Sequence, residues 1–177
     1  MSIIGHKFRD YKNQENIEIL ILGTFNPDVP NNPADFFYER GKNYLWNLLP
    51  KVFDYKELKN SGLTEKKEFI DKFKIGFTDI IQEVDVDSEN ETNYADDYID
   101  SKVLKWIDFE KFLKNYDSLK KVFFTRKTFK DVPKMKEQID LIKEICSKHS
   151  VSFSCLPTPA RFSNQKKLNE WISIIKK

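Results

Sequence analysis

Residues that can position a water molecule are concentrated in the segment GTFNPDVPNNPADFFYERGKNYLW, which runs from Gly23 to Trp46. An Asn side chain can orient a water molecule and a carboxylate can polarise one, so Asn26 and Asp28 are candidates for hydrolytic chemistry. Asn26-Pro27 also favours a sharp turn. The residue types alone leave a purely structural turn open, because Asn, Pro and Asp are common in exposed turns.

The pattern around this segment predicts an α/β fold. The apolar run from Ile17 to Leu22 is typical of a buried parallel strand, and residues 75–81, 119–125 and 151–156 also predict strands. Helical spacing of apolar residues predicts helices over 42–53, 64–73, 108–116 and 133–148, and a last helix capped by Asn164 or Ser163. Alternating strands and helices favour a three-layer α/β/α sandwich with a mainly parallel four-stranded sheet.

The order of strands and loops predicts where a ligand binds. In open parallel sheets, ligands bind beyond the carboxyl ends of the strands. We therefore expect the loops that begin near Gly23, Thr78 and Pro157 to meet at one site. Residues 83–100 contain eight carboxylates and no basic residue, and they lack the Gly of a calcium-binding loop. We expect a solvated loop there.

Composition limits the class of protein. A chain of 177 residues, 40% hydrophobic and 14% aromatic, is expected to form a single domain over residues 1–177. No apolar run approaches the roughly 20 residues that span a bilayer, and the N-terminus lacks a signal-peptide pattern, so we expect a soluble, cytoplasmic protein. The sequence has two cysteines, Cys146 and Cys155, which form no CxxC pair, and two histidines, His6 and His149. We expect reduced thiols, no metal site and no cofactor.

Charge is unevenly distributed along the sequence although the formal net charge is only +2. Residues 1–100 hold 12 Lys/Arg and 20 Asp/Glu, whereas residues 101–177 hold 18 Lys/Arg and 8 Asp/Glu. The basic second half is compatible with a surface for a polyanion, but charges separated in sequence can intermingle on the folded surface.

Three segments resemble motifs of the uracil-DNA glycosylase superfamily. GTFNP after an apolar strand is similar to the first motif, and Asn26 precedes Pro27 as in the mismatch-specific branch. YERGKNYLW, residues 38–46, resembles the Tyr-x-His-Pro-Arg-Asn-x-Phe-Trp segment of the hypoxanthine (deoxyinosine) branch. LPTPARF, residues 156–162, is similar to the second motif, a loop that presses on the DNA strand.

The sequence also departs from these patterns. The spacing from Gly23 to Pro27 is one residue longer than in the hypoxanthine branch, and Asp28 stands where a Gly often follows the Pro. Arg40-Gly41 replaces His-Pro, and PTPARF has no His where some branches place an electrophilic one.

The resemblance implies a uracil-DNA glycosylase-like fold and a monofunctional DNA glycosylase of base-excision repair. Such an enzyme flips a deaminated or mismatched base, here of the uracil or hypoxanthine class, out of the helix and hydrolyses its N-glycosidic bond. We expect a monomer whose partner is single- or double-stranded DNA with a damaged base. The resemblance adds Asn43 to Asn26 and Asp28 as a catalytic candidate.

The resemblance also assigns binding roles. The residues expected to hold the base are Gly23, Thr24, Phe25, Phe37 and Tyr38. The residues expected to contact DNA are Lys42, Thr158, Arg161, Phe162 and Lys166. For any one of the rings, packing in the core is the structural alternative.

Two other functions stay open. The chain could be a nucleic-acid or nucleotide-binding module that kept the fold without the chemistry. It could also hydrolyse free nucleosides, because the net charge is low for a strong DNA binder.

Overall fold

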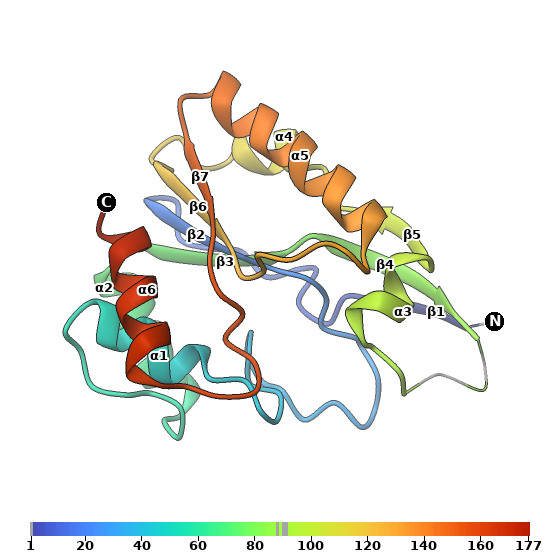
Figure 1. Cartoon of the computed structure of the whole chain (residues 1–177), viewed down its shortest axis with the longest axis horizontal. Helices are drawn as coiled ribbons and strands as arrows, with labels where there is room; N and C mark the ends of the chain where they lie inside the picture. Colours follow the sequence, from blue (N-terminus) through green and yellow to red (C-terminus); the bar gives the residue numbers. More distant parts are fainter. Residues whose placement is uncertain (1, 88, 90–91) are drawn as a thin grey trace.

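A parallel four-stranded sheet forms the centre of the molecule. The structure is a computed structural model that describes residues 2–87, 89 and 92–177. Its central sheet consists, in spatial order, of β3 (Ile75–Asp79), β2 (Ile19–Gly23), β6 (Lys121–Phe124) and β7 (Ser152–Cys155), all parallel (Figure 1). The prediction of four parallel strands from the apolar runs is confirmed.

Helices cover both faces of this sheet (Figure 1). One layer consists of α1 (Leu45–Val52), α2 (Leu63–Lys72) and α6 (Gln165–Ile175). The other consists of α4 (Phe109–Leu113) and α5 (Pro133–Lys148). Successive residues of β2 point to opposite faces, so Ile21 belongs to the core under α1, α2 and α6, whereas Leu20 and Leu22 belong to the core under α4 and α5. The predicted three-layer sandwich is thus confirmed.

None of the described helices is long and apolar enough to cross a bilayer.

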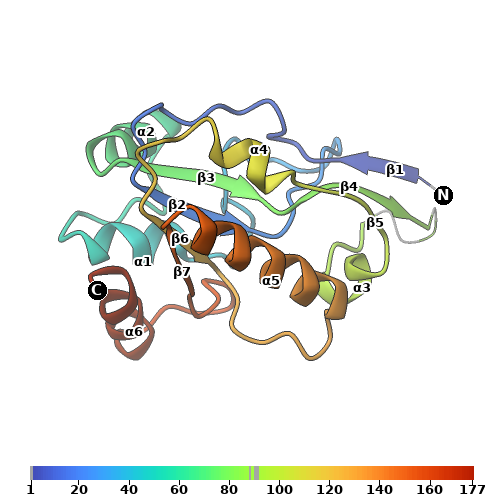
Figure 2. The same ribbon diagram turned by 90° about the horizontal axis from the view of Figure 1, so that it is seen from above.

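A second, antiparallel sheet, absent from the sequence prediction, continues from the end of β3. Its strands, in spatial order, are β1 (Ser2–Gly5), β4 (Ile81–Val86) and β5 (Val103–Trp106). Only Ile80 separates β3 from β4, so the chain passes directly from one sheet to the other (Figure 2).

The expectation of a solvated loop over residues 83–100 is wrong where this segment forms β4 and α3 (Asp96–Asp100). Val84 and Val86 are buried, whereas Glu83 and Asp85 between them are partly exposed. This alternation has the two-residue period of a half-buried strand. The prediction of a loop rested on the number of carboxylates in the segment and not on this period. Residues 88, 90 and 91 of the stretch lie outside the described residues.

Two helix starts were predicted correctly. The side chain of Asp108 accepts a hydrogen bond from the Lys111 N–H at 3.0 Å, and Asn164 accepts one from the Lys167 N–H at 2.8 Å. Both are N-caps, because they satisfy an amide that has no partner within the helix.

Helix α1, in contrast, begins at Leu45 and not at the predicted residue 42. The preceding residues pair with the loop that follows β7: the Tyr44 N–H donates to the Pro159 carbonyl at 2.9 Å, and the Arg161 N–H donates to the Lys42 carbonyl at 2.9 Å. These bonds join two of the segments that sequence analysis expected to meet.

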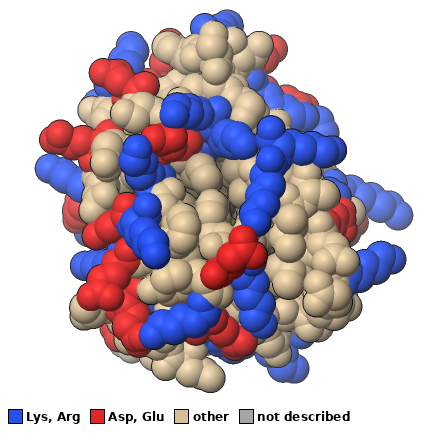
Figure 3. Space-filling model, turned by 90° about the vertical axis from the view of Figure 1, so that its left-hand side faces the viewer, with Lys and Arg blue, Asp and Glu red and all other residues tan. Residues whose placement is uncertain are grey.

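The acidic and basic halves of the sequence intermingle on the surface. Ion pairs between the two halves include Lys120–Glu18, Arg126–Asp96 and Lys176–Asp54. The face seen in Figure 3 accordingly carries basic and acidic side chains among one another. The charge asymmetry of the sequence therefore does not translate into one basic and one acidic half of this face.

Candidate active site

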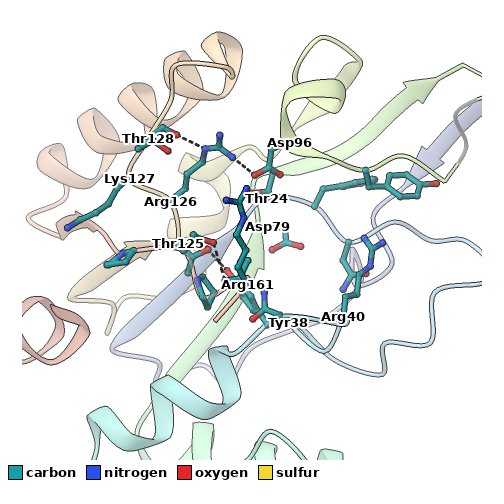
Figure 4. A pocket seen from close by; sticks show the side chains of 18 of the residues that line it. Thr24, Tyr38, Arg40, Asp79, Asp96, Thr125, Arg126, Lys127, Thr128 and Arg161 are labelled. Atoms are coloured by element: carbon teal, nitrogen blue, oxygen red, sulfur yellow. Dashed lines mark hydrogen bonds and ion pairs between the residues drawn. The ribbon is translucent and has the colours of Figure 1, made fainter. Parts of the chain in front are cut away.

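A pocket of about 700 Å³ lies at the carboxyl ends of the parallel strands (Figure 4). Its volume is within the range of roughly 300–1,000 Å³ that is usual for small-ligand sites. The residues that line it are Thr24, Phe25, Asn26, Tyr38, Arg40, Asn43, Asp79, Tyr94, Asp96, Thr125, Arg126, Lys127, Thr128, Pro157, Thr158, Pro159, Ala160, Arg161 and Glu170. Most of them lie at or after the ends of β2, β3, β6 and β7, so the pocket occupies the place where ligands bind in open parallel sheets. Tyr94 and Asp96 follow β4, and Glu170 lies in α6.

Seven of the thirteen predicted site residues line this pocket. They are Thr24, Phe25, Asn26, Tyr38, Asn43, Thr158 and Arg161. The structure thus brings together the segments after β2 and β7 and the segment before α1, which the three sequence motifs occupy. The roles of these residues remain predictions.

Six predicted residues do not line the pocket. Asp28 is exposed, and its N–H donates to the Gly5 carbonyl at 2.9 Å. Phe37 is only 2% exposed and stacks on Phe77 with ring centroids 5.7 Å apart, so its ring belongs to the core. Gly23 is buried at the end of β2. The last three, Lys42, Phe162 and Lys166, are exposed outside the pocket.

Tyr38, Asp79 and Thr125 gather beside Gly23. An ideal Cβ atom at Gly23 would lie 2.1 Å from Asp79 Oδ1 and 2.7 Å from Tyr38 Oη, so only glycine allows these oxygens to approach the end of β2. The Tyr38 hydroxyl is hydrogen-bonded to Thr125 Oγ1 at 3.0 Å (Figure 4). Burial and the nearby Asp79 carboxylate raise the pKa of Tyr38 well above its usual value. The phenol therefore stays protonated.

Asp79 forms a hydrogen bond with His6, the residue that directly follows β1. His6 Nε2 lies 2.7 Å from Asp79 Oδ2, and the two residues are only 2% and 5% exposed. In the sequence, 73 positions separate the two residues, so no local pattern indicates the pair. Two pairings place His6 there: β1 pairs with β4, the strand that follows Asp79, and His6 forms an antiparallel bridge with Pro27 in the turn after β2.

The two pocket asparagines have their amide oxygens engaged. Asn26 Oδ1 accepts a hydrogen bond from Asn32 Nδ2 at 2.5 Å. Asn43 Oδ1 accepts one from the Leu45 N–H at 3.0 Å, at the start of α1. These bonds fix both amides, and they orient the Asn26 NH₂ group as a hydrogen-bond donor for a ligand.

Two aromatic rings form one wall of the pocket. The rings of Phe25 and Tyr94 lie with centroids 6.1 Å apart, and the Arg40 guanidinium carbon is 5.7 Å from the Tyr94 centroid. A wall of this kind can stack on a flat ligand.

Cations and carboxylates pair at the rim of the pocket. Arg126 Nη1 contacts Asp96 Oδ2 at 2.5 Å, and Lys127 pairs with Glu170 (Figure 4 labels Arg126, Asp96 and Lys127). Burial raises the pKa of Asp96 even though Arg126 opposes the shift. Arg161 is exposed and has a φ of 74°. A positive φ at a non-glycine residue costs about 1–3 kcal/mol, so the surrounding structure must hold this conformation.

Several pocket residues were missed by sequence analysis. Asp79 and Thr125 end predicted strands, so the topology that pointed to Thr78 could have identified them. Tyr94 and Asp96 belong to the acidic stretch that was expected to be solvated, and no local pattern marked them. No group of three or more His, Cys, Asp or Glu side chains that could hold a metal ion occurs among the described residues.

Comparisons with known proteins identify the fold. No protein-family model matches the sequence, and no curated protein matches it. The structure is similar to the solution NMR structure of a candidate uracil DNA glycosylase from Methanosarcina acetivorans, with a TM-score of 0.59 and 19% sequence identity. The similarity covers 92% of this chain and 91% of the other. At this level of identity, the comparison shows a shared uracil-DNA glycosylase-like fold and no more.

Proposed function

We propose that the protein is a DNA glycosylase that hydrolyses the N-glycosidic bond of a deaminated or mismatched base of the uracil or hypoxanthine class. The observation that carries the proposal is the pocket itself, where an aromatic wall, fixed amides and a carboxylate converge at the carboxyl ends of the sheet. The reaction passes through an oxocarbenium-like sugar and a departing base anion, and it needs a positioned water. The pocket contains groups for each of these tasks.

The pocket can hold a flipped base by stacking and by hydrogen bonds to its edge. Phe25 and Tyr94 offer ring surface, and the Asn26 NH₂ group can donate to a carbonyl oxygen of the base. Uracil and hypoxanthine present such an oxygen, which deamination creates. Donation to this oxygen also favours the departing anion, because negative charge develops there.

The rim offers contacts for a DNA strand. Arg161 and Thr158 lie in the loop after β7, which is hydrogen-bonded to residues 42–44. Arg40 and Arg126 lie on other sides of the same opening (Figure 4). Arginine guanidinium groups bind phosphate oxygens through two parallel hydrogen bonds, so this arrangement can fix a strand over the pocket.

Base release from defined oligonucleotides tests the proposal. The purified protein is incubated with single-stranded and duplex oligonucleotides that contain uracil, hypoxanthine or xanthine, and alkali then cleaves abasic sites. We expect strand breaks with at least one of these bases and a loss of roughly 10²-fold or more in the Asn26→Ala protein. DNA binding without breaks on any substrate would instead identify a non-catalytic binding module.

Hydrolysis of free nucleosides is the second candidate, and the rim ion pairs favour it. Asp96 and Glu170 already occupy Arg126 and Lys127, which leaves these cations less available to DNA phosphates. Base release from free deoxyuridine or deoxyinosine, with none from oligonucleotides, would establish this function in place of the first.

A further inference from the structure

The hydrogen bond between His6 and Asp79 has a fixed direction. His6 Nδ1 accepts a hydrogen bond from the Phe8 N–H at 3.1 Å, so Nδ1 carries no proton. A neutral imidazole then carries its proton on Nε2, which donates to Asp79 Oδ2 at 2.7 Å. Asp79 Oδ2 is therefore an acceptor, and His6 faces it as a neutral donor.

Asp79 differs from the other carboxylates of the pocket because no Lys or Arg pairs with it. Asp96 is bound to Arg126 and Glu170 to Lys127, whereas the ion pairs of the described residues give Asp79 no partner other than His6. Of the three residues predicted to be catalytic, Asp28 lies outside the pocket, and the amide oxygens of Asn26 and Asn43 each accept a hydrogen bond already. Among the described carboxylates that line the pocket, Asp79 is thus the one with no cation to reduce its basicity.

We propose that Asp79 is the general base of the reaction and that His6 is its positioning residue; this inference rests on the proposed function. The C1′–N bond breaks and its electron pair leaves with the base. The oxygen of a water molecule bonds to C1′, and one proton of that water passes to Asp79 Oδ1. Asp79 then releases this proton to solvent, and the departing base takes one from solvent, so the overall reaction consumes one water.

The surroundings of Asp79 fit this role. Oδ1 lies beside Gly23, whose lack of a side chain leaves room for it, and Tyr38 Oη lies next to the same position. Tyr38 remains protonated and can hold the water together with Asp79. The ionisable groups that bear on the site are His6 on Oδ2, Tyr38 beside Oδ1, and the Asp96–Arg126 pair, whose carboxylate also acts on Tyr38.

Single-turnover base release in the Asp79→Asn protein is the principal test. The amide can still accept from His6, so the fold is kept, but it cannot take a proton. We expect the rate constant to fall by roughly 100-fold or more while DNA affinity stays within about threefold. The matched control is Asp117→Asn, the same change at an exposed aspartate outside the pocket, which leaves the rate unchanged.

Variants of His6 separate positioning from folding. His6→Phe removes the hydrogen-bond donor that holds the Asp79 carboxylate, so we expect the single-turnover rate constant to fall by roughly tenfold or more while DNA affinity stays within about threefold. His6→Gln keeps an N–H donor and is expected to restore most of the wild-type rate constant. Thermal unfolding of each variant shows whether it is folded.

Three results would overturn the inference. An Asp79→Asn rate constant within threefold of wild type would do so, and so would an effect confined to DNA affinity, which would make Asp79 a binding residue. A rate constant of folded His6→Phe within threefold of wild type, or no recovery in folded His6→Gln, would remove the positioning role. Absence of base release by the wild-type protein would instead overturn the proposed function, and this inference with it.

Discussion

The side-chain amide of Asn32 donates a hydrogen bond of 2.5 Å to the Oδ1 atom of Asn26, and both side chains are buried. Asn32 also donates to the Pro27 carbonyl at 2.7 Å and accepts from the Ala34 N–H at 3.2 Å. One side chain thus holds the turn after β2 and the orientation of the Asn26 amide in the pocket.

Replacing Asn32 by Ala is expected to impair both stability and activity. It leaves buried polar groups of Asn26 and Pro27 without their partner, which costs about 1–3 kcal/mol. It also frees the Asn26 amide to rotate, so base release is expected to slow by roughly tenfold or more. Urea unfolding and single-turnover base release measure the two effects. Asn31→Ala, at the exposed neighbouring position, is the control and is expected to change neither.

Gly23→Ala is expected to disrupt the pocket floor. The added Cβ would lie 2.1 Å from Asp79 Oδ1 and 2.7 Å from Tyr38 Oη, and both side chains are held by hydrogen bonds. We expect a loss of about 1–3 kcal/mol in the free energy of unfolding, together with a loss of base release. Gly62→Ala is the matched control, because a Cβ there meets no atom within 4 Å. Equal stability of the two variants would show that the floor can rearrange.

The central sheet was predictable because its strands are continuous apolar runs, as burial on both faces requires. The second sheet was not, because its strands carry weaker signals. Ser2–Gly5 is only four residues long, and β4 combines its alternating valines with carboxylates that resemble a solvated loop. Its pairing with β1 joins residues that are 78–84 positions apart, a relationship that no local pattern encodes.

The same distinction applies to the site. Asn26, Tyr38 and Asn43 lie in compact motifs, so their spacing indicated a common pocket before the fold was available. His6 and Asp79, in contrast, become neighbours through long-range pairings of the β1 segment with β4 and with the turn after β2. Phe37 shows the opposite case. Its position in the sequence suited base stacking, but the rings of Phe8, Phe36 and Phe77 pack against it and bury it. Ring orientation depends on packing, which the sequence motif does not specify.

Asp96→Asn is expected to strengthen DNA binding. The substitution removes the charge that holds Arg126, so the guanidinium becomes available to phosphate. In fluorescence anisotropy titrations, we expect tighter DNA binding. We also expect the slope of log K against log salt concentration to become steeper by up to about the contribution of one phosphate contact. Because burial raises the pKa of Asp96, acidification neutralises this residue before ordinary aspartates. The DNA affinity of the wild-type protein should therefore rise as the pH falls. In Asp96→Asn this rise should be smaller, because residue 96 no longer titrates. Asp97→Asn, an exposed neighbour, is the control.

The charge of Glu18 is expected to stabilise the fold at all but strongly acidic pH. Its carboxylate contacts Lys74 Nζ at 2.5 Å and Lys120 Nζ at 2.7 Å, next to the starts of β3, β2 and β6. The hydrogen bonds from Lys120 and Lys74 lower the pKa of Glu18 from 4.5 to about 2. A carboxyl group with a lowered pKa in the folded state stabilises the fold above its unfolded-state pKa, and this contribution is lost as the pH falls towards 2.

Glu18→Gln should therefore be less stable than wild type above about pH 4.5, and the two stabilities should converge as the pH approaches 2. Urea unfolding across this range measures the difference, and NMR titration of the Glu18 carboxyl carbon gives its pKa directly. Glu15→Gln, at an exposed glutamate for which the described residues show no ion pair, is the control and should follow the wild-type curve. A constant difference between Glu18→Gln and wild type at all pH values would mean that the side chain acts through packing and not through its charge.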